Sequence, residues 1–306
     1  MKKNRVVSVC VFSSLVLFLC ACNVEQAATS VGSEAPVVSS VETSSLADDE
    51  ESTQFHLTQT EVVNKTKYEG ERDFETFLSR ASAWALIPAL NEAFIPQGIA
   101  YSEENARVYI SQYASEQVAS VIVALDAASG GMVSEYHLYN PDETPFTCHV
   151  GGVACTERYL FVSAKQDNEG GYQIARFPLE SVTAEGCTNL TVSDSFSVPV
   201  SPSFLNCSNG YLWVGNFYYP RDEYVLQGEM NYTVAASDGE YGCFILGYRL
   251  NKIDAEQTDT SEPDCVLLAT EKIQGMTFAG TDSVWLSQSY GRKNNSALLK
   301  YQVRFG

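Results

Sequence analysis

Basic residues are scarce in this chain of 306 residues: 19 Lys and Arg stand against 38 Asp and Glu, for a net charge of −19. Such a charge repels nucleic-acid phosphates and anionic lipid surfaces. We therefore expect no nucleic-acid partner and no membrane attachment through a basic surface. Histidine is also rare, with three residues, which leaves few candidates for acid–base chemistry.

Several catalytic and metal-binding motifs are missing. The sequence has no Gly-x-Ser-x-Gly motif, no His-Glu-x-x-His motif and no glycine-rich phosphate loop. It also has no Cys-x-x-Cys, which argues against a zinc site of that type. We expect no metal and no cofactor. The many carboxylates leave a catalytic pair open, but the sequence does not select one.

The first 22 residues resemble a bacterial lipoprotein signal peptide. Three basic residues precede an apolar run over 6–19, which is too short to span a bilayer comfortably. The run ends Leu-Cys-Ala-Cys, which resembles a lipobox with Cys20 where a small residue is usual. The resemblance implies cleavage before Cys22, lipidation of Cys22 and anchoring at the extracytoplasmic face of the cell membrane. The alternatives are an ordinary signal peptide cut elsewhere or an uncleaved anchor.

The following segment, 23–54, is rich in Ser, Thr, Ala, Val and acidic residues and precedes the first aromatic of this region, Phe55. Such a composition buries too little apolar surface to offset the entropy of ordering. We expect 23–54 to be a disordered tether that holds the folded domain, 55–306, away from the membrane.

Four sequence repeats fill most of the folded domain. Each begins with a short strand around a small residue, followed by a turn and a strand that reads aliphatic, aromatic, aliphatic, tiny and then usually an amide. The first strands are expected at 97–101, 151–155, 202–206 and 274–278, and the second strands at 108–112, 160–164, 212–216 and 284–288.

A third strand begins at a similar place in each repeat, and a fourth fits in three of them. The gap before the third strand is the same in three repeats, so the longer gap in repeat three indicates an insertion within 217–244. The third strands begin at Ile122, Ile174, Ile245 and Leu298, and the fourth are expected at 132–139, 191–198 and 265–273.

Four short strands in a unit of roughly 50 residues are typical of a β-propeller blade. Because one blade cannot bury both of its faces, neighbouring blades must pack on it and form a ring. We predict an all-β propeller with four countable blades. Five blades remain open, because 66–95 could contain a degenerate repeat.

The ring needs a closing strand, because the last repeat ends after three strands and exposed sheet edges are usually covered. The alternating segment 55–63 is the predicted cover. After it, apolar residues recur at helical spacing within 72–90, which predicts one short amphipathic helix ended by Pro88.

Six cysteines follow the lipobox, and an even number in an exported chain permits 15 disulfide connectivities. The predicted strand positions suggest that Cys243 pairs with Cys265, and Cys187 with Cys207 is a second candidate pair. Six free thiols are the alternative.

Repeated amides provide the first set of candidate ligand-binding residues, because ligands of propellers usually lie on the axis or at one mouth. Side chains with both a donor and an acceptor suit hydroxyl- or amide-bearing ligands. The alternative is that they bond to the backbone of neighbouring blades. These residues are Gln97, Gln274, Gln112, Asn216 and Gln288.

Residues that break the symmetry provide the second set. His149 precedes the first strand of repeat two and is a candidate ligand or acid–base group, or a hydrogen-bonded structural histidine. Tyr290 and Arg292 follow the second strand of repeat four, where Arg292 could hold an anion or pair with a nearby acid. The insertion in 217–244 concentrates tyrosines that could stack on sugars, contact a protein or extend the blade.

The repeats resemble those of uncharacterised secreted bacterial propeller proteins. The resemblance covers roughly 95–306 and depends on the strand 274–276, the segment Leu-Ser-Gln-Ser-Tyr-Gly-Arg at 286–292, and the pattern from Ser296 to Tyr301. The blades are also similar to those of propeller lactonases and streptogramin lyases. The metal ligands of such lactonases cannot be placed in this sequence, so the resemblance implies no activity.

Taken together, the residues predict a lipid-anchored extracytoplasmic binding or interaction module whose partner could be a small molecule, a glycan or a protein. A propeller hydrolase or lyase acting on a small lactone or glycoside, with His149 as acid–base, is the alternative. A structural envelope scaffold is a third class.

Overall fold

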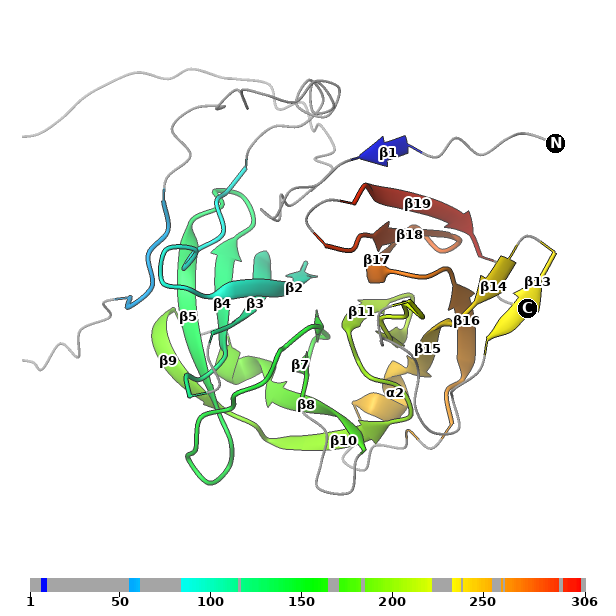
Figure 1. Cartoon of the computed structure of the whole chain (residues 1–306). Helices are drawn as coiled ribbons and strands as arrows, with labels where there is room; N and C mark the ends of the chain where they lie inside the picture. Colours follow the sequence, from blue (N-terminus) through cyan, green and yellow to red (C-terminus); the bar gives the residue numbers. More distant parts are fainter. Residues whose placement is uncertain are drawn as a thin grey trace, which may run out of the picture.

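The computed structural model describes residues 7–9, 55–60, 84–114, 117–164, 171–182, 185–221, 233–237, 239–254, 260, 262–291 and 294–303. Four antiparallel sheets lie around a common centre (Figure 1), which confirms the predicted four-bladed β-propeller. The helical elements within these described parts are short: η2 (Leu179–Val182) and α2 (Leu250–Ile253).

Blades one and two each have the four strands that the repeats predict, and blade one gains a fifth. That fifth strand, β9, comes from the chain of blade two and pairs in parallel with the outer strand of blade one. Blade one consists of β2 (Ile95–Ser102), β3 (Arg107–Tyr113), β4 (Val121–Asp126), β5 (Met132–Tyr139) and β9 (Gly186–Thr191). Blade two consists of β6 (Val153–Cys155), β7 (Tyr159–Ser163), β8 (Tyr172–Pro178) and β10 (Asp194–Val198).

Blades three and four complete the ring. In the insertion of repeat three, the described part forms a hairpin of β13 (Val234–Ala236) and β14 (Gly239–Tyr241). Blade three consists of β11 (Phe204–Ser208), β12 (Tyr211–Gly215), β15 (Cys243–Arg249) and β16 (Cys265–Ala269). Blade four consists of β17 (Ile273–Ala279), β18 (Ser283–Gln288), β19 (Ser296–Gln302) and β1 (Val7–Val9).

The closing strand is N-terminal, as expected, but it is not the predicted one. β1 pairs antiparallel with β19, and Val7 lies opposite Leu298. The part of 55–63 that the structure describes, 55–60, is irregular and lies against blade one instead. Glu135 of β5 accepts hydrogen bonds from the backbone N–H groups of 56 and 57. These two amides therefore bond to a side chain and not to a neighbouring β-strand.

The predicted helix over 72–90 can be compared with the structure only at its end. Residues 72–83 lie outside the described residues, and 84–90 form irregular chain and turns. Ile87 and Ala89 are buried there, in the same cluster as Leu57. Among the described residues, no helix is long and apolar enough to cross a membrane.

The blades bury each other's faces, which is why the ring forms. Tyr109 and Tyr136 of blade one pack with Phe177 of blade two, and the next two interfaces have equivalent clusters around Phe161 and Trp213. The other face of blade one is covered by Leu57, Ile87 and Ala89. Because both of its faces are covered, β4 is buried at every position from 121 to 125.

The repeated Gln-Gly motif corresponds to a β-bulge in the inner strands of blades one and four. The β2–β3 register shifts between Pro96 and Gly98, so Gln97 is the extra residue, and β17 has the same shift around Gln274. A bulge of this kind bends the strand at the crowded centre of the ring. At Gly98 an added Cβ would lie 2.9 Å from the backbone nitrogen of Val153 in the next blade, so only glycine fits.

All six cysteines between 148 and 265 are free thiols, so the predicted pairs 243–265 and 187–207 are not formed. In the β15–β16 ladder, Cys243 lies opposite Ala269 and Cys265 lies opposite Gly247. The two cysteines therefore lie at opposite ends of the ladder, and register explains why they do not meet.

Candidate functional sites at the entrance face and on blade one

One face of the ring gathers the residues that the sequence singled out. The inner strands begin at this face and the second strands end there, because each such pair is antiparallel: Pro96 lies opposite Gln112, and Ile273 lies opposite Gln288. We call it the entrance face. Of the predicted ligand-binding residues, Arg292 lies outside the described residues, as does the predicted lipidation residue Cys22.

The amides at the ends of the second strands bond to nearby backbone. Gln112 is fully buried and donates to the carbonyl of Pro88, and Gln288 donates to the carbonyl of Glu271 at 2.8 Å. Asn216 is fully buried, and its Oδ1 accepts from the N–H of Phe244 at 2.6 Å. The three amides therefore bond to backbone, but Phe244 lies in the same blade as Asn216, Pro88 in the N-terminal segment and Glu271 just before β17, rather than in neighbouring blades. Their role in ligand binding remains a prediction.

The two bulged glutamines are more accessible. Gln274 is exposed, and its Nε2 donates to the carbonyl of Ser289 at 2.8 Å. Gln97 is half-buried and bonds to the carbonyl of its own neighbour, Pro96, at 3.0 Å. Each side-chain carbonyl can still accept a hydrogen bond from a ligand.

His149 lies between blades one and two at the entrance face. It is exposed, and its ring centroid lies 4.4 Å from that of Tyr113, which ends β3. Removal from water by this packing lowers the pKa of His149. Within the described residues, no carboxylate is bonded to His149. Its neighbour is the aromatic ring of Tyr113 and not an acidic group that could assist proton transfer.

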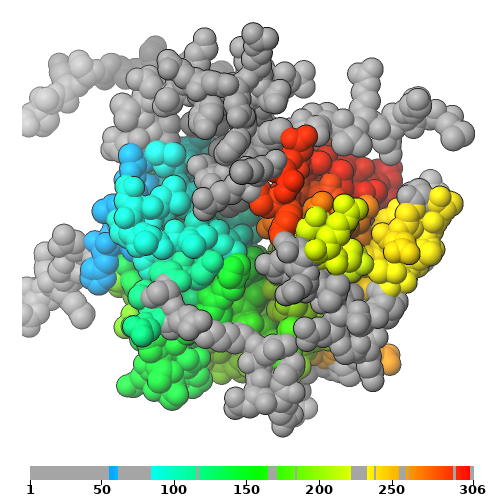
Figure 2. Space-filling model, viewed as in Figure 1, coloured from blue at the N-terminus to red at the C-terminus, as the bar shows by residue number. Residues whose placement is uncertain are grey.

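An aromatic cluster lies between blades three and four at the same face. Tyr290 lies 4.6 Å from Tyr219 and 6.0 Å from Phe217, measured between ring centroids. All three rings are partly accessible. Lys272 lies over the Tyr219 ring at 4.5 Å and pairs with Glu271 at 3.0 Å. In Figure 2, yellow-green atoms of blade three lie beside orange-red atoms of blade four. The cluster therefore combines rings and hydroxyls with a paired, locally neutral charge.

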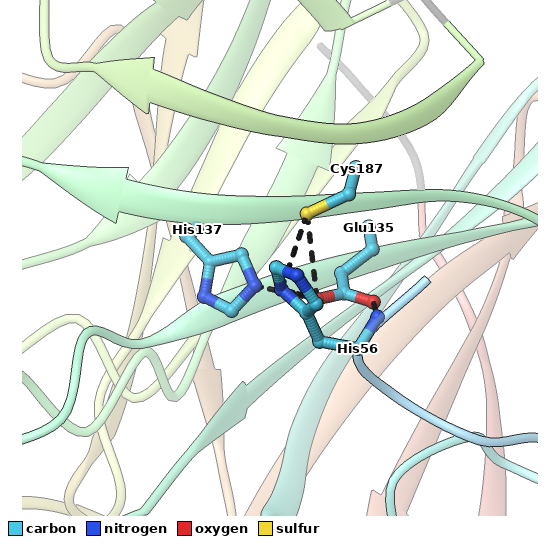
Figure 3. Close-up of side chains that lie close together, drawn as sticks. All are labelled: His56, Glu135, His137 and Cys187. Carbon is cyan, nitrogen blue, oxygen red and sulfur yellow. Dashed lines mark hydrogen bonds and ion pairs between the residues drawn. The ribbon is translucent and has the colours of Figure 1, made fainter. Parts of the chain in front are cut away.

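A second group of reactive side chains lies far from these, on the outer edge of blade one. Glu135 and His137 lie on β5, Cys187 is opposite Glu135 on β9, and His56 comes from the N-terminal segment (Figure 3). Their four donor atoms all lie within 4.8 Å of one another. We call these four residues the blade-one cluster.

Glu135 is the centre of this cluster. Its Oε2 accepts from the N–H groups of His56 and Leu57 at 2.9 and 2.8 Å, and its Oε1 lies 2.5 Å from Nε2 of His137. Burial alone would raise the pKa of Glu135, but hydrogen bonds from His137 and the two amides outweigh it and hold this pKa below its usual range. The carboxylate is therefore ionised at neutral pH.

The surroundings of Glu135 also keep the thiol of Cys187 protonated. Burial, together with the negative charge of Glu135, raises its pKa to about 11. Its Sγ lies 3.6 Å from Oε1 of Glu135 and 3.7 Å from Nδ1 of His56.

Sequence reasoning missed the blade-one cluster, although one signal was present. Glu135 and His137 are two apart on a strand that the sequence predicted, so their side chains share one face. His56 and Cys187 join them only through tertiary contacts that no repeat suggests, namely the N-terminal segment and the parallel β5–β9 pairing.

Comparisons with known proteins yield no family. No protein-family model and no curated protein matches the sequence. Among solved structures, the chain is similar to Kuenenia stuttgartiensis hydrazine synthase, with 11% identity and a TM-score of 0.37; the match covers 68% of this chain and 46% of that one. It is also similar to BamB from Moraxella catarrhalis, with 8% identity and a TM-score of 0.27; here the match covers 68% of this chain and 86% of that one. Likeness this low carries no argument about function.

Proposed function

We propose that the chain is a lipid-anchored extracytoplasmic binding module that holds a neutral glycan at its entrance face. The aromatic cluster of Phe217, Tyr219 and Tyr290 is the observation that supports this proposal most. Aromatic rings offer a large apolar area at a low entropy cost, and tyrosine adds a hydroxyl that can bond to a sugar.

Charge narrows the class of ligand. The net charge of −19 opposes a polyanion, and Lys272 at the cluster is already paired with Glu271. A neutral oligosaccharide needs ring faces, donors and acceptors rather than charges. The exposed Gln274 and the half-buried Gln97 provide such groups at the same face.

The enzyme alternative receives less support. One pocket on the axis is lined by the inner strands of three blades, including Tyr101, Cys155 and Cys207, and contains neither a histidine nor a carboxylate. His149 contacts Tyr113 rather than an acid. Neither observation assembles the pair of groups that hydrolysis or elimination requires.

The lipobox at 19–22 and the tether 23–54 support the location proposed here. Lipid on Cys22 would keep the ring close to the membrane, and the tether would leave the entrance face free to reach a ligand. Metabolic labelling with a clickable fatty acid tests the anchor: we expect label on the wild-type chain and none on Cys22→Ala.

Binding is tested with a panel of neutral oligosaccharides on the detergent-purified full chain, followed by calorimetry of the saccharides that bind. We expect Tyr219→Ala and Tyr290→Ala each to weaken binding by roughly tenfold or more, since removing a stacked ring costs about 1.4 kcal/mol or more. Tyr101→Ala, at the opposite end of an inner strand, is the matched control and should leave the affinity unchanged.

His149→Ala should keep the fold and weaken the same binding, because His149 is exposed beside Tyr113. Unchanged affinity would remove His149 from the site. Equal affinity in the two tyrosine variants and wild type, or binding by none of the saccharides, would contradict the glycan proposal.

A further inference from the structure

We propose that the blade-one cluster is a zinc site that fastens the N-terminal segment to the ring. Four donors of zinc-binding type, two imidazoles, a carboxylate and a thiol, converge within 4.8 Å from three separate parts of the chain. A mixed nitrogen, sulfur and oxygen set of four is typical of zinc rather than of calcium or magnesium, which prefer oxygen alone. The inference does not depend on glycan binding.

The three distances among the donors of His56, Glu135 and Cys187 fit a tetrahedral ion. Zinc bonds of about 2.1 Å to nitrogen or oxygen and 2.3 Å to sulfur place neighbouring donors about 3.4 to 3.6 Å apart. Oε1 of Glu135 lies 3.6 Å from Nδ1 of His56 and 3.6 Å from Sγ of Cys187, and those two lie 3.7 Å apart. Only His137 is too close to Glu135, at 2.5 Å, and must move outward by about 1 Å.

The carboxylate is already oriented for this role. Both N–H bonds go to its Oε2, which fixes the group and leaves Oε1 facing the other three donors. Its side chain is 0% exposed, whereas that of His137 is 20% exposed and that of His56 73% exposed. The ion can therefore enter from the solvent side, next to His56. Hydrogen bonds that orient a metal ligand in this way raise affinity.

Charge balance also favours a dication. Binding of zinc forms a zinc–sulfur bond as the Cys187 thiol loses its proton to solvent. A site with two neutral imidazoles, a thiolate and a carboxylate then has zero net charge around Zn²⁺. Without a metal, the buried carboxylate is compensated by the two backbone N–H groups and by His137, which both bonds to it and interacts with its charge.

The position of the ligands indicates a structural role. Four protein donors fill a tetrahedral zinc ion and leave no position for a substrate. His56 lies in 55–60, which covers blade one through Leu57, and Cys187 lies on β9, which joins blade two to blade one. One ion would tie the start of the domain and this strand to the same blade edge.

The test measures metal on the full chain, purified in detergent with reductant after growth with added zinc. We expect about one zinc per chain by mass spectrometry of the metal. Chelator competition should show roughly hundredfold or greater weakening for His137→Gln and Cys187→Ser, since even outer contacts of a ligand change affinity by 10- to 100-fold. The matched control is His149→Gln, which alters the remaining histidine and should keep full zinc content.

Cobalt provides a readout of the thiolate. Co²⁺ in place of zinc should give sulfur-to-metal charge-transfer absorption in wild type and in His149→Gln, and none in Cys187→Ser. Because Cys187 is partly buried, His56→Gln is the variant to use if Cys187→Ser fails to fold: His56 is exposed and lies outside any strand.

Loss of zinc from the folded cluster variants, with retention in the control, supports the site. Wild type without bound zinc, or equal zinc affinity in folded His56→Gln and wild type, would overturn the proposal and leave the four residues as a hydrogen-bonded cluster. Glycan affinity is measured separately on the same samples, so failure of one proposal does not obscure the other.

Discussion

In blades one and two, the serine near the end of the second strand has a defined structural role in the ring. Ser111 is fully buried; its hydroxyl accepts from the N–H of Gly98 at 3.0 Å and donates to the carbonyl of Val150 at 2.8 Å. It therefore joins its own inner strand to the chain that enters blade two. Ser163 accepts from the N–H of Gly152 in the same way.

Ser111→Ala should lower the free energy of unfolding by about 1–3 kcal/mol, because it leaves a buried N–H and a buried carbonyl without this partner. Chemical denaturation measures the change. Ser195→Ala, at an exposed position on β10, is the control and should change stability by less than about 0.5 kcal/mol. A loss as small as that in the control would show that the hydroxyl is not a link between blades.

Residue roles were harder to predict than residue positions. The sequence placed Gln112, Asn216 and Gln288 at equivalent points of the repeat, and the structure keeps them equivalent. It could not decide between ligand and backbone as their partner, because that depends on burial. The blade-one cluster shows the same limit, since its four members are brought together by folding and not by spacing.

At the scale of elements, the repeat pattern predicted the strands of the blades well, because each is a short apolar stretch bounded by turns. Met132–Tyr139 agrees with its predicted bounds residue for residue. Two errors have one physical cause: β9 and 55–60 both bind the edge or face of blade one, and such contacts leave no local pattern.

The outer edge of blade four is expected to change when the signal peptide is removed. β1, the partner of β19, lies within the predicted signal peptide, so cleavage before Cys22 would remove it. In the processed chain, β19 would then be an edge strand with outward amides exposed to water. By hydrogen exchange, we expect these amides within Ser296–Gln302 to exchange fast, while those of the inner neighbour β18 stay protected.

Equal protection of β19 and β18 in the processed chain would contradict this expectation and require another segment to cover the edge. The uncleaved Cys22→Ala chain is the control, because it keeps β1 and should retain slower exchange at 296–298, the part of β19 that β1 pairs with.

At the scale of the molecule, burial of the apolar faces of the blades is what holds the ring together. Three interfaces between blades have their own clusters, whereas the remaining face of blade one is covered by the N-terminal segment through Leu57, Ile87 and Ala89. That segment follows the predicted tether, so whatever fastens it would also fix the point where the ring meets its proposed anchor. The proposed zinc ion is such a fastening.

Thermal unfolding of the full chain with excess zinc and with chelator tests this account most directly. A ligand at a hundred times its dissociation constant adds about 2.7 kcal/mol of stability, which for a domain of this size corresponds to roughly 5–10 °C in Tm. We expect that difference in wild type and in His149→Gln, and none in Cys187→Ser. The same Tm for wild type with zinc and with chelator would contradict the account.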